Sequence, residues 1–415
     1  MAEALVNTPD RAAIRDAVRA ICDRFDDNYW SEKDRTHSFP HEFAKAIADG
    51  GWLGIAMPAA YGGSGLGVTE AAVMMHEVGR SAGAFAACST VHINIFGLHA
   101  IVKHGSDEQR RKWLPPIIDG SVRACFGVTE PDAGLDTGRI KTRAVRHGDH
   151  YVVQGQKIWT STAQQADKIV LLARTTPIED CVKPTDGLSL FYTDMDRTKI
   201  TVQEIPKMGR HAVNSNLTFF DGLVVPIEHR VGEEGKGFRY ILDSLNPERI
   251  LNAAEVVGMG QRALDKAVAY AGERVVFGRP IGKNQAIQHP LAECWSELYA
   301  AELMTLHAAE LYDAGLPCGA QANVAKYLAR RLSRLRSRRP HPRRHGLRGR
   351  VPRRALFPRD GGGPACAGLT RNDPVLHRRA RTGVAQILLS GNRPRPARGR
   401  AWRLASTSGR PHPSH

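Results

Sequence analysis

The order of helix-forming and strand-forming segments restricts the fold more than any other feature of this sequence. Segments with helical spacing fill residues 1–120, short β-prone runs such as YVVQGQKIW and LSLFYTDM fill residues 121–232, and helical spacing returns at residue 233. Strands do not alternate with helices, which excludes a doubly wound nucleotide fold and a β/α barrel. We therefore expect an α+β protein with an N-terminal helical domain, a central β-barrel or sheet domain and a C-terminal helical bundle.

Local signals support both helical regions. Thr8 and Pro9 have the residue types favoured at the cap and first position of a helix, and apolar residues follow at spacings of four, three and four. In the second region, helical spacing places on one face Ile250, Leu251, Ala254, Val257, Leu264 and Val268. Each helix should therefore bury one apolar stripe.

The last part of the chain differs from the rest in charge. Residues 327–415 contain 23 arginines, no lysine and two acids, whereas the first 326 residues carry 35 basic and 40 acidic residues. The body is therefore mildly acidic, and we expect no nucleic-acid partner. We interpret residues 330–415 as a disordered tail read out of frame, which leaves the C-terminal helical domain truncated at residues 233–329. The alternative is a genuine disordered arm that binds nucleic acid or an acidic membrane surface.

Several functional classes lack sequence support. We find no apolar run near the roughly 18 residues of a membrane span, and the N-terminus mixes acids with bases, so we expect a cytoplasmic protein without a membrane partner. The seven cysteines are scattered and indicate reduced thiols. We expect no metal site. Four histidines have no carboxylate or cysteine at the spacing of metal ligands, and we assign them to helix surfaces: His76, His92, His99 and His104. No GxSxG elbow supports serine hydrolysis.

Four motifs occur in one order: FGVTEPDAGLDT, GQKIWTSTAQQADK, KMGRHAVNSNLTFFDGLVVP and ERVVFGRPIGKNQ. With the order of the domains, they resemble the acyl-CoA dehydrogenase family of flavoproteins over about residues 9–329. The resemblance implies the cofactor FAD. It also implies that the flavin ring lies against Phe126, Val128, Thr129, Trp159 and Ser161, with hydroxyl and amide donors at its edge. Without the resemblance, the first motif is a capped loop and Trp159 a core residue.

The resemblance implies a second set of cofactor contacts. Arg274, Phe277 and Gln285 match residues that hold the adenosine diphosphate part of FAD across a subunit contact. An arginine fork suits a pyrophosphate. Taken alone, Arg274 would be a charge at a helix C-terminus, with Phe277 as its packing anchor.

The chemistry needs a carboxylate that removes a proton beside a thioester carbonyl, and a dry pocket raises the pKa of such a base. Glu248 matches the base of a minority of the family, and Glu255, seven residues later, is the fallback. The alternative is a structural role, in which Glu248 is an acidic residue in the first turn of a helix, after Pro247, where the helix dipole favours negative charge. The resemblance also implies substrate contacts at Asn246, at Arg249 near the CoA moiety, and at Leu135, where the family usually has serine.

We therefore expect α,β-dehydrogenation of an acyl-CoA, with electrons passed to an electron-transfer flavoprotein and with a homotetramer or homodimer if the C-terminus were intact. Two alternatives stay open. One is an acyl-CoA oxidase or flavin monooxygenase on the same scaffold. The other is a non-catalytic chain, because the C-terminal bundle is incomplete.

Overall fold

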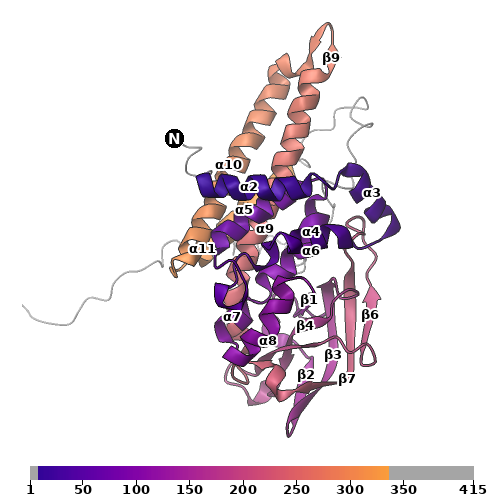
Figure 1. Cartoon of the computed structure of the whole chain (residues 1–415), viewed down its shortest axis with the longest axis vertical. Helices are drawn as coiled ribbons and strands as arrows, with labels where there is room; N and C mark the ends of the chain where they lie inside the picture. The colour runs from indigo at the N-terminus through magenta and orange to yellow at the C-terminus, as the bar shows by residue number, and fades with distance from the viewer. Residues whose placement is uncertain (1–7, 336–415) are drawn as a thin grey trace, which may run out of the picture. The chain divides into compact units, whose positions relative to one another are not determined.

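The computed structural model describes residues 8–335 (Figure 1). The first helices are α2 (Pro9–Cys22), α3 (Asp27–Thr36), α4 (His41–Asp49), α5 (Val68–Arg80), α6 (Ala84–Phe96), α7 (His99–His104) and α8 (Asp107–Ile118). Thr8 accepts a hydrogen bond from the Arg11 amide at 3.3 Å and Pro9 opens α2, as the sequence predicts. Of the tail predicted for residues 330–415, the structure describes only residues 330–335, which are helical and end the last helix. The rest of the predicted tail lies outside the described residues.

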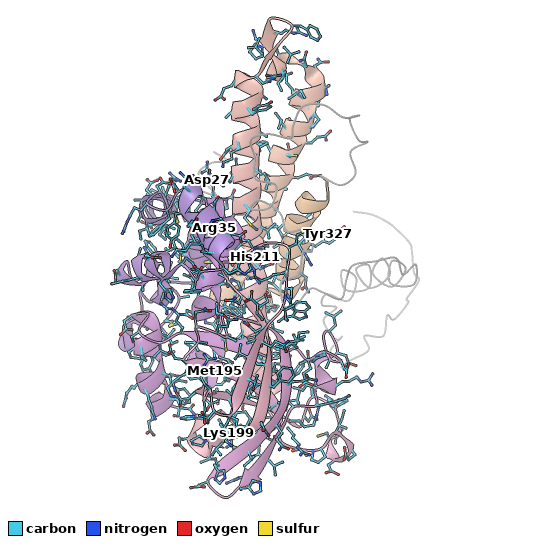
Figure 2. All side chains as sticks on the ribbon, turned by 90° about the vertical axis from the view of Figure 1, so that its right-hand side faces the viewer. Asp27, Arg35, Met195, Lys199, His211 and Tyr327 are labelled. Atoms are coloured by element: carbon cyan, nitrogen blue, oxygen red, sulfur yellow. The ribbon has the colours of Figure 1, made fainter. Side chains whose placement is uncertain are left out.

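An eight-stranded mixed sheet follows the first helices. Its strands are β1 (Ala124–Gly127), β2 (Arg143–His147), β3 (His150–Ser161), β4 (Lys168–Arg174), β5 (Leu188–Asp194), β6 (Ile200–Glu204), β7 (Ser215–Pro226) and β8 (Arg230–Val231). The order is β6-β7-β3-β2-β4-β5-β8, and β1 pairs with β4 in parallel. Met195 and Lys199, between β5 and β6, are labelled in Figure 2. The expected β domain is therefore an open sheet along this path.

The C-terminal region consists of α9 (Gly237–Glu273), α10 (Gln285–Asp313) and α11 (Gly319–Leu335). The two-stranded hairpin β9 (Val275–Val276) and β10 (Arg279–Pro280) joins α9 to α10. Helix α9 packs against α5, α6 and α7, and α10 and α11 also pack against it. This helix therefore links the N-terminal helices to the C-terminal ones.

The start of α9 corrects the first-turn interpretation of Glu248. The helix begins at Gly237, so Pro247 and Glu248 lie well inside it. A proline cannot donate to the carbonyl four residues earlier, which here belongs to Asp243. The hydroxyl of Tyr312 on α10 donates to that Asp243 carbonyl at 3.4 Å. Tertiary packing thus replaces the missing hydrogen bond, and the helix continues through the proline.

Three other expectations need correction. Val268 is 52% exposed, although the other members of its predicted stripe are buried, because the far half of the α9–α10 hairpin extends beyond the N-terminal helices. Residues 84–104 are apolar enough by composition to cross a membrane, but most of that window is buried inside the fold, as in a core helix. His76 and His99 are buried rather than on helix surfaces, because α5 and α7 are covered by other helices.

Candidate active site

The segment from Phe126 to Leu135 leaves β1 and turns tightly. Glu130 and Ala133 exchange two backbone hydrogen bonds, at 3.1 and 3.2 Å. The Glu130 carboxylate accepts hydrogen bonds from the Lys141 amide at 2.6 Å, the Thr142 amide at 2.9 Å and the Lys157 ammonium at 2.9 Å. The acid of this motif therefore holds the loop in shape. Leu135, beyond the turn, is 66% exposed.

Lys157 is fully buried beneath this segment. Its ammonium donates to the Val128 carbonyl at 3.1 Å as well as to Glu130. Burial lowers the pKa of Lys157 to about 8, although the Glu130 charge opposes that change. The Ile158 amide also donates to the Thr129 carbonyl at 2.9 Å. These contacts fix β3 against the segment that follows β1.

The end of β3 has an irregular backbone. Its pairing with β7 shifts register between Lys157 and Thr160, and both Trp159 and Thr162 have left-handed φ values, 64° and 60°. Non-glycine residues in this region are strained, and such strain concentrates at functional sites. The shift leaves Trp159 half-buried and Ser161 buried opposite Ser215 of β7.

Two hydroxyls at this junction have no protein partner. Within residues 8–335, no hydrogen bond is made by the side chain of Thr129, which is half-buried, or by that of Ser161, which is buried. Phe126 and Val128 are half-buried beside them, and the Phe126 ring lies 5.6 Å from that of Phe96 on α6. Unpaired hydroxyls beside apolar side chains fit an aromatic ligand with a hydrogen-bonding edge. The residues expected to contact the flavin ring are thus brought together.

Glu248 projects from α9 toward α11. Its two carboxylate oxygens each accept a hydrogen bond from the Lys326 ammonium at 3.1 Å, and both side chains are largely buried. Close by on α9, Arg249 donates to the Asn246 side chain at 3.4 Å. Sequence reasoning missed Lys326, because the residue is far from Glu248 in the chain and has no motif of its own.

Glu255, the fallback base, is 1% exposed and forms an ion pair with His92 on α6. Burial lowers the pKa of His92, but the charges of Glu255 and, more weakly, Glu248 outweigh this and raise it. His92 is therefore not a surface histidine, because the α6 face that carries it packs on α9. The sequence did contain a signal for this buried pair, because Glu255 is a charged residue among the apolar residues of α9.

Arg274, Phe277 and Gln285 lie elsewhere in the chain. All three are exposed around the β9–β10 hairpin, and Phe277 is fully exposed with a left-handed φ of 52°. Among residues 8–335, Phe277 therefore packs against no other side chain, which overturns its role as an internal packing anchor. Arg274 follows α9, about 40 Å along the helix axis from Glu248. Figure 1 shows β9 at the end of α9 away from the sheet.

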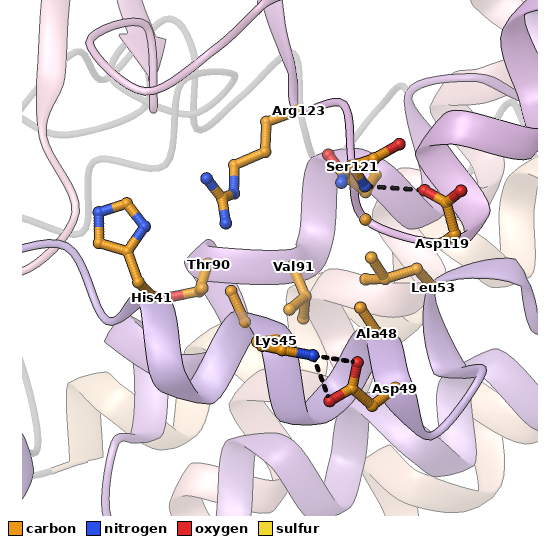
Figure 3. Close-up of a pocket in the computed structure, with 13 residues that line it drawn as sticks. His41, Lys45, Ala48, Asp49, Leu53, Thr90, Val91, Asp119, Ser121 and Arg123 are labelled. Atoms are coloured by element: carbon orange, nitrogen blue, oxygen red, sulfur yellow. Dashed lines mark hydrogen bonds and ion pairs between the residues drawn. The ribbon is translucent and has the colours of Figure 1, made fainter.

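A cavity of about 340 Å³ lies between α4, α6 and residues 119–123 (Figure 3). Its basic residues are His41, Lys45, which pairs with Asp49, and Arg123, whose guanidinium lies 5.3 Å from the Phe39 ring. None of the residues singled out in the four motifs lines it. The cavity is therefore separate from the candidate active site, although Arg123 directly precedes β1.

Comparison with known proteins decides the family. Three family models match in the expected order: "Acyl-CoA dehydrogenase, N-terminal domain" over residues 8–121, the middle domain over residues 125–223 and the C-terminal domain over residues 235–339. Acyl-CoA dehydrogenase FadE12 of Mycobacterium tuberculosis is 35% identical over 337 residues, which cover 79% of this chain and 84% of that protein. The chain belongs to the acyl-CoA dehydrogenase family.

Solved structures agree with this assignment. Butyryl-CoA dehydrogenase from Megasphaera elsdenii matches with a TM-score of 0.73 and 28% identity, over 79% of this chain and 85% of that one. A chain in the structure of the electron transferring flavoprotein of Acidaminococcus fermentans has the same TM-score at 31% identity, with coverage of 79% and 85%. The expected α+β architecture is therefore confirmed.

Proposed function

We propose that this acyl-CoA dehydrogenase binds FAD and introduces a double bond between the α and β carbons of an acyl-CoA. The observation that carries the proposal is the pair of unpartnered hydroxyls, Thr129 and Ser161, held together by the contacts of Lys157 and Ile158 with the β1 segment. When bound there, the flavin supplies a hydride acceptor for the β carbon. Thr129 and Ser161 then donate to the ring edge, while Phe126, Val128 and Trp159 form its apolar surroundings.

Glu248 is the proposed base. Its carboxylate takes the α proton of the thioester and becomes a neutral acid. Lys326 holds that carboxylate through one hydrogen bond to each oxygen, which leaves a second lone pair on each oxygen to take the proton. Helix α9 also presents Asn246 and Arg249 for the CoA moiety. Leu135 is the third proposed substrate contact, and its exposure suits a position at the mouth of the site.

The hairpin residues are proposed to serve a second copy of the chain. Arg274, Phe277 and Gln285 are exposed, and Arg274 lies about 40 Å along the α9 axis from Glu248. They therefore suit the adenosine diphosphate part of FAD bound by a neighbouring subunit. A homodimer or homotetramer would cover the exposed apolar side chains of this region, which include Val268, Val275 and Phe277.

A cytoplasmic location remains a prediction. The proposed acceptor of the electrons is an electron-transfer flavoprotein. Support comes from the similarity to a chain in an electron transferring flavoprotein structure. Oxygen consumption during turnover distinguishes this reaction from that of an oxidase or monooxygenase. A non-catalytic chain would bind no FAD, or would bind FAD that no acyl-CoA reduces.

The direct test of the base is the variant Glu248→Gln, which keeps size and removes the charge. We expect the rate of flavin bleaching by acyl-CoA under anaerobic conditions to fall by about 10²- to 10⁴-fold, with FAD content unchanged. Glu179→Gln, at an exposed position between β4 and β5, is the matched control and should bleach at the normal rate. Normal bleaching by Glu248→Gln would remove this residue as the base.

A further inference from the structure

One wall of the cavity between α4, α6 and residues 119–123 carries two basic side chains, Arg123 and His41 (Figure 3). The ring of Phe39, which is buried, lies 5.3 Å from the Arg123 guanidinium and 5.0 Å from the His41 ring. Within residues 8–335, neither basic side chain forms a hydrogen bond or an ion pair. One aromatic ring therefore positions both groups, and their donors are free for a ligand.

Helix α6 adds a buried hydrogen-bond donor to the lining. Asn94 is only 7% exposed, and its Oδ1 atom accepts from the Ala124 amide at 3.5 Å. Its amide nitrogen has no acceptor in the part of the chain that the structure describes. A buried amide without a partner is costly, so a ligand that accepts a hydrogen bond here is favoured. The rest of the lining is largely apolar and includes Ala44, Ala48, Leu53 and Val91.

The two acidic residues of the cavity do not neutralise the basic wall. Both carboxylate oxygens of Asp49 are bound by the Lys45 ammonium at 2.7 Å. The carboxylate of Asp119 accepts from the Ser121 amide at 2.8 Å. Figure 3 shows both carboxylates across the cavity from the two basic side chains. The basic wall therefore keeps its capacity for an anion.

The cavity is separated from the proposed active site by α6 itself. Thr90 and Asn94 of this helix line the cavity, whereas its Phe96 lies 5.6 Å from Phe126 in the proposed flavin segment. At 3.6 residues per turn, Phe96 is roughly on the opposite face of the helix from the other two. A ligand of the cavity is therefore not the acyl-CoA bound at the flavin.

We propose that the cavity is an accessory binding site for a small organic carboxylate. Its carboxylate group accepts hydrogen bonds from Arg123 and Asn94, with His41 beside them, and its apolar part packs against Leu53 and Val91. An arginine fork matches the two oxygens of a carboxylate. This inference goes beyond the proposed function and does not depend on it.

Size and charge select this class of ligand. The cavity holds about 340 Å³, within the range of roughly 300–1,000 Å³ that small organic ligands occupy, so an inorganic ion alone would leave most of it unfilled. Burial and the charge of Arg123 lower the pKa of His41, so at neutral pH the basic wall carries the single charge of Arg123. A singly charged carboxylate balances that wall better than a doubly charged phosphate.

Calorimetric titration of the full chain loaded with FAD tests the proposal. The probes are acetate, butyrate, hexanoate and benzoate, each beside the uncharged amide of the same acid, and inorganic phosphate. We expect one of the longer carboxylates to bind at least about tenfold more tightly than its amide and than phosphate, because hydrogen bonds between charged groups are the stronger ones. Failure of all four carboxylates to bind, or equal affinity for acid and amide, would overturn the proposal.

Variants locate the bound carboxylate. Arg123→Gln should lower the affinity by about 10- to 100-fold, and Arg146→Gln, which removes an exposed arginine of β2, is the control and should keep it. If Arg123→Gln does not fold, His41→Ala at an exposed position should still lower the affinity by about 3- to 10-fold. Binding that these changes leave intact would place the carboxylate elsewhere and refute the site, whatever the activity of the protein on acyl-CoA.

Discussion

Lys157 and Glu130 are buried against each other beneath the segment that carries Thr129. The sequence motifs indicated that this segment is important, but they could not show how it is held. Its geometry depends on a lysine from β3 that reaches the Val128 carbonyl. Likewise, Lys326 on α11 and His92 on α6 come from elements other than α9, so no local pattern could place them beside Glu248 and Glu255.

Lys157 gives a prediction about pH. Its pKa is lowered by burial to about 8 in the folded protein, whereas an unfolded lysine stays protonated up to about pH 10.5. Between these values the unfolded state binds more protons, so this residue contributes a free energy of unfolding that rises with pH. Relative to Lys157→Met, the wild-type chain should therefore gain a few kcal/mol (about 1.4 per pKa unit) from pH 8 to pH 10.5. Denaturant unfolding at both pH values measures this, and parallel behaviour of the two proteins would contradict it.

At the scale of elements, the sequence predicted which segments are helices better than it predicted where those helices begin and end. The cap and stripe of α2 predicted that helix, because its signals are local. The start of α9 was missed because Pro247 normally disfavours a helix interior, and only the Tyr312 hydroxyl from α10 explains why it is tolerated here. The packing of α2, α5 and α10 likewise depends on charges far apart in sequence.

Those three helices meet at a buried charge network. Glu77 on α5 contacts Arg15 of α2 at 3.2 Å and Arg19 of α2 at 3.3 Å, and Arg15 contacts Glu302 of α10 at 2.7 Å. Burial raises the pKa of Glu77, but His76, Arg19 and Arg15 outweigh it and lower the pKa to about 2. The stabilisation is therefore present above about pH 4.5 and is lost as pH falls toward 2.

We expect Glu77→Gln to lower the free energy of unfolding by about 2–3 kcal/mol at neutral pH, because the buried guanidinium of Arg15 keeps only one of its two carboxylate partners, Glu302. The difference from wild type should shrink as pH falls below 4.5. Glu310→Gln, which removes the partly exposed partner of Arg11, should cost about 0–1 kcal/mol. Chemical denaturation across this pH range is the measurement. A Glu77 variant as stable as the Glu310 variant would show that the network contributes little.

At the scale of the whole molecule, the sequence order of helices and strands predicted the architecture, but one chain presents only part of the proposed site. The flavin-ring residues converge within the chain, while Arg274, Phe277 and Gln285 are exposed at the hairpin. Phe277→Ala should leave the thermal stability of the isolated chain unchanged, because the Phe277 side chain is fully exposed. It should lower the ratio of bound FAD to protein and the fraction of oligomer in light scattering. Unchanged FAD content and mass would argue against a site shared between copies.

The most direct measurement is an anaerobic titration of the FAD-loaded protein with acyl-CoA, followed by the visible absorbance of the flavin. The account predicts that the flavin absorbance disappears as the substrate is added, and that it does so only slowly in Glu248→Gln. A protein that takes up no FAD would contradict it, as would a flavin spectrum that no acyl-CoA of any chain length changes.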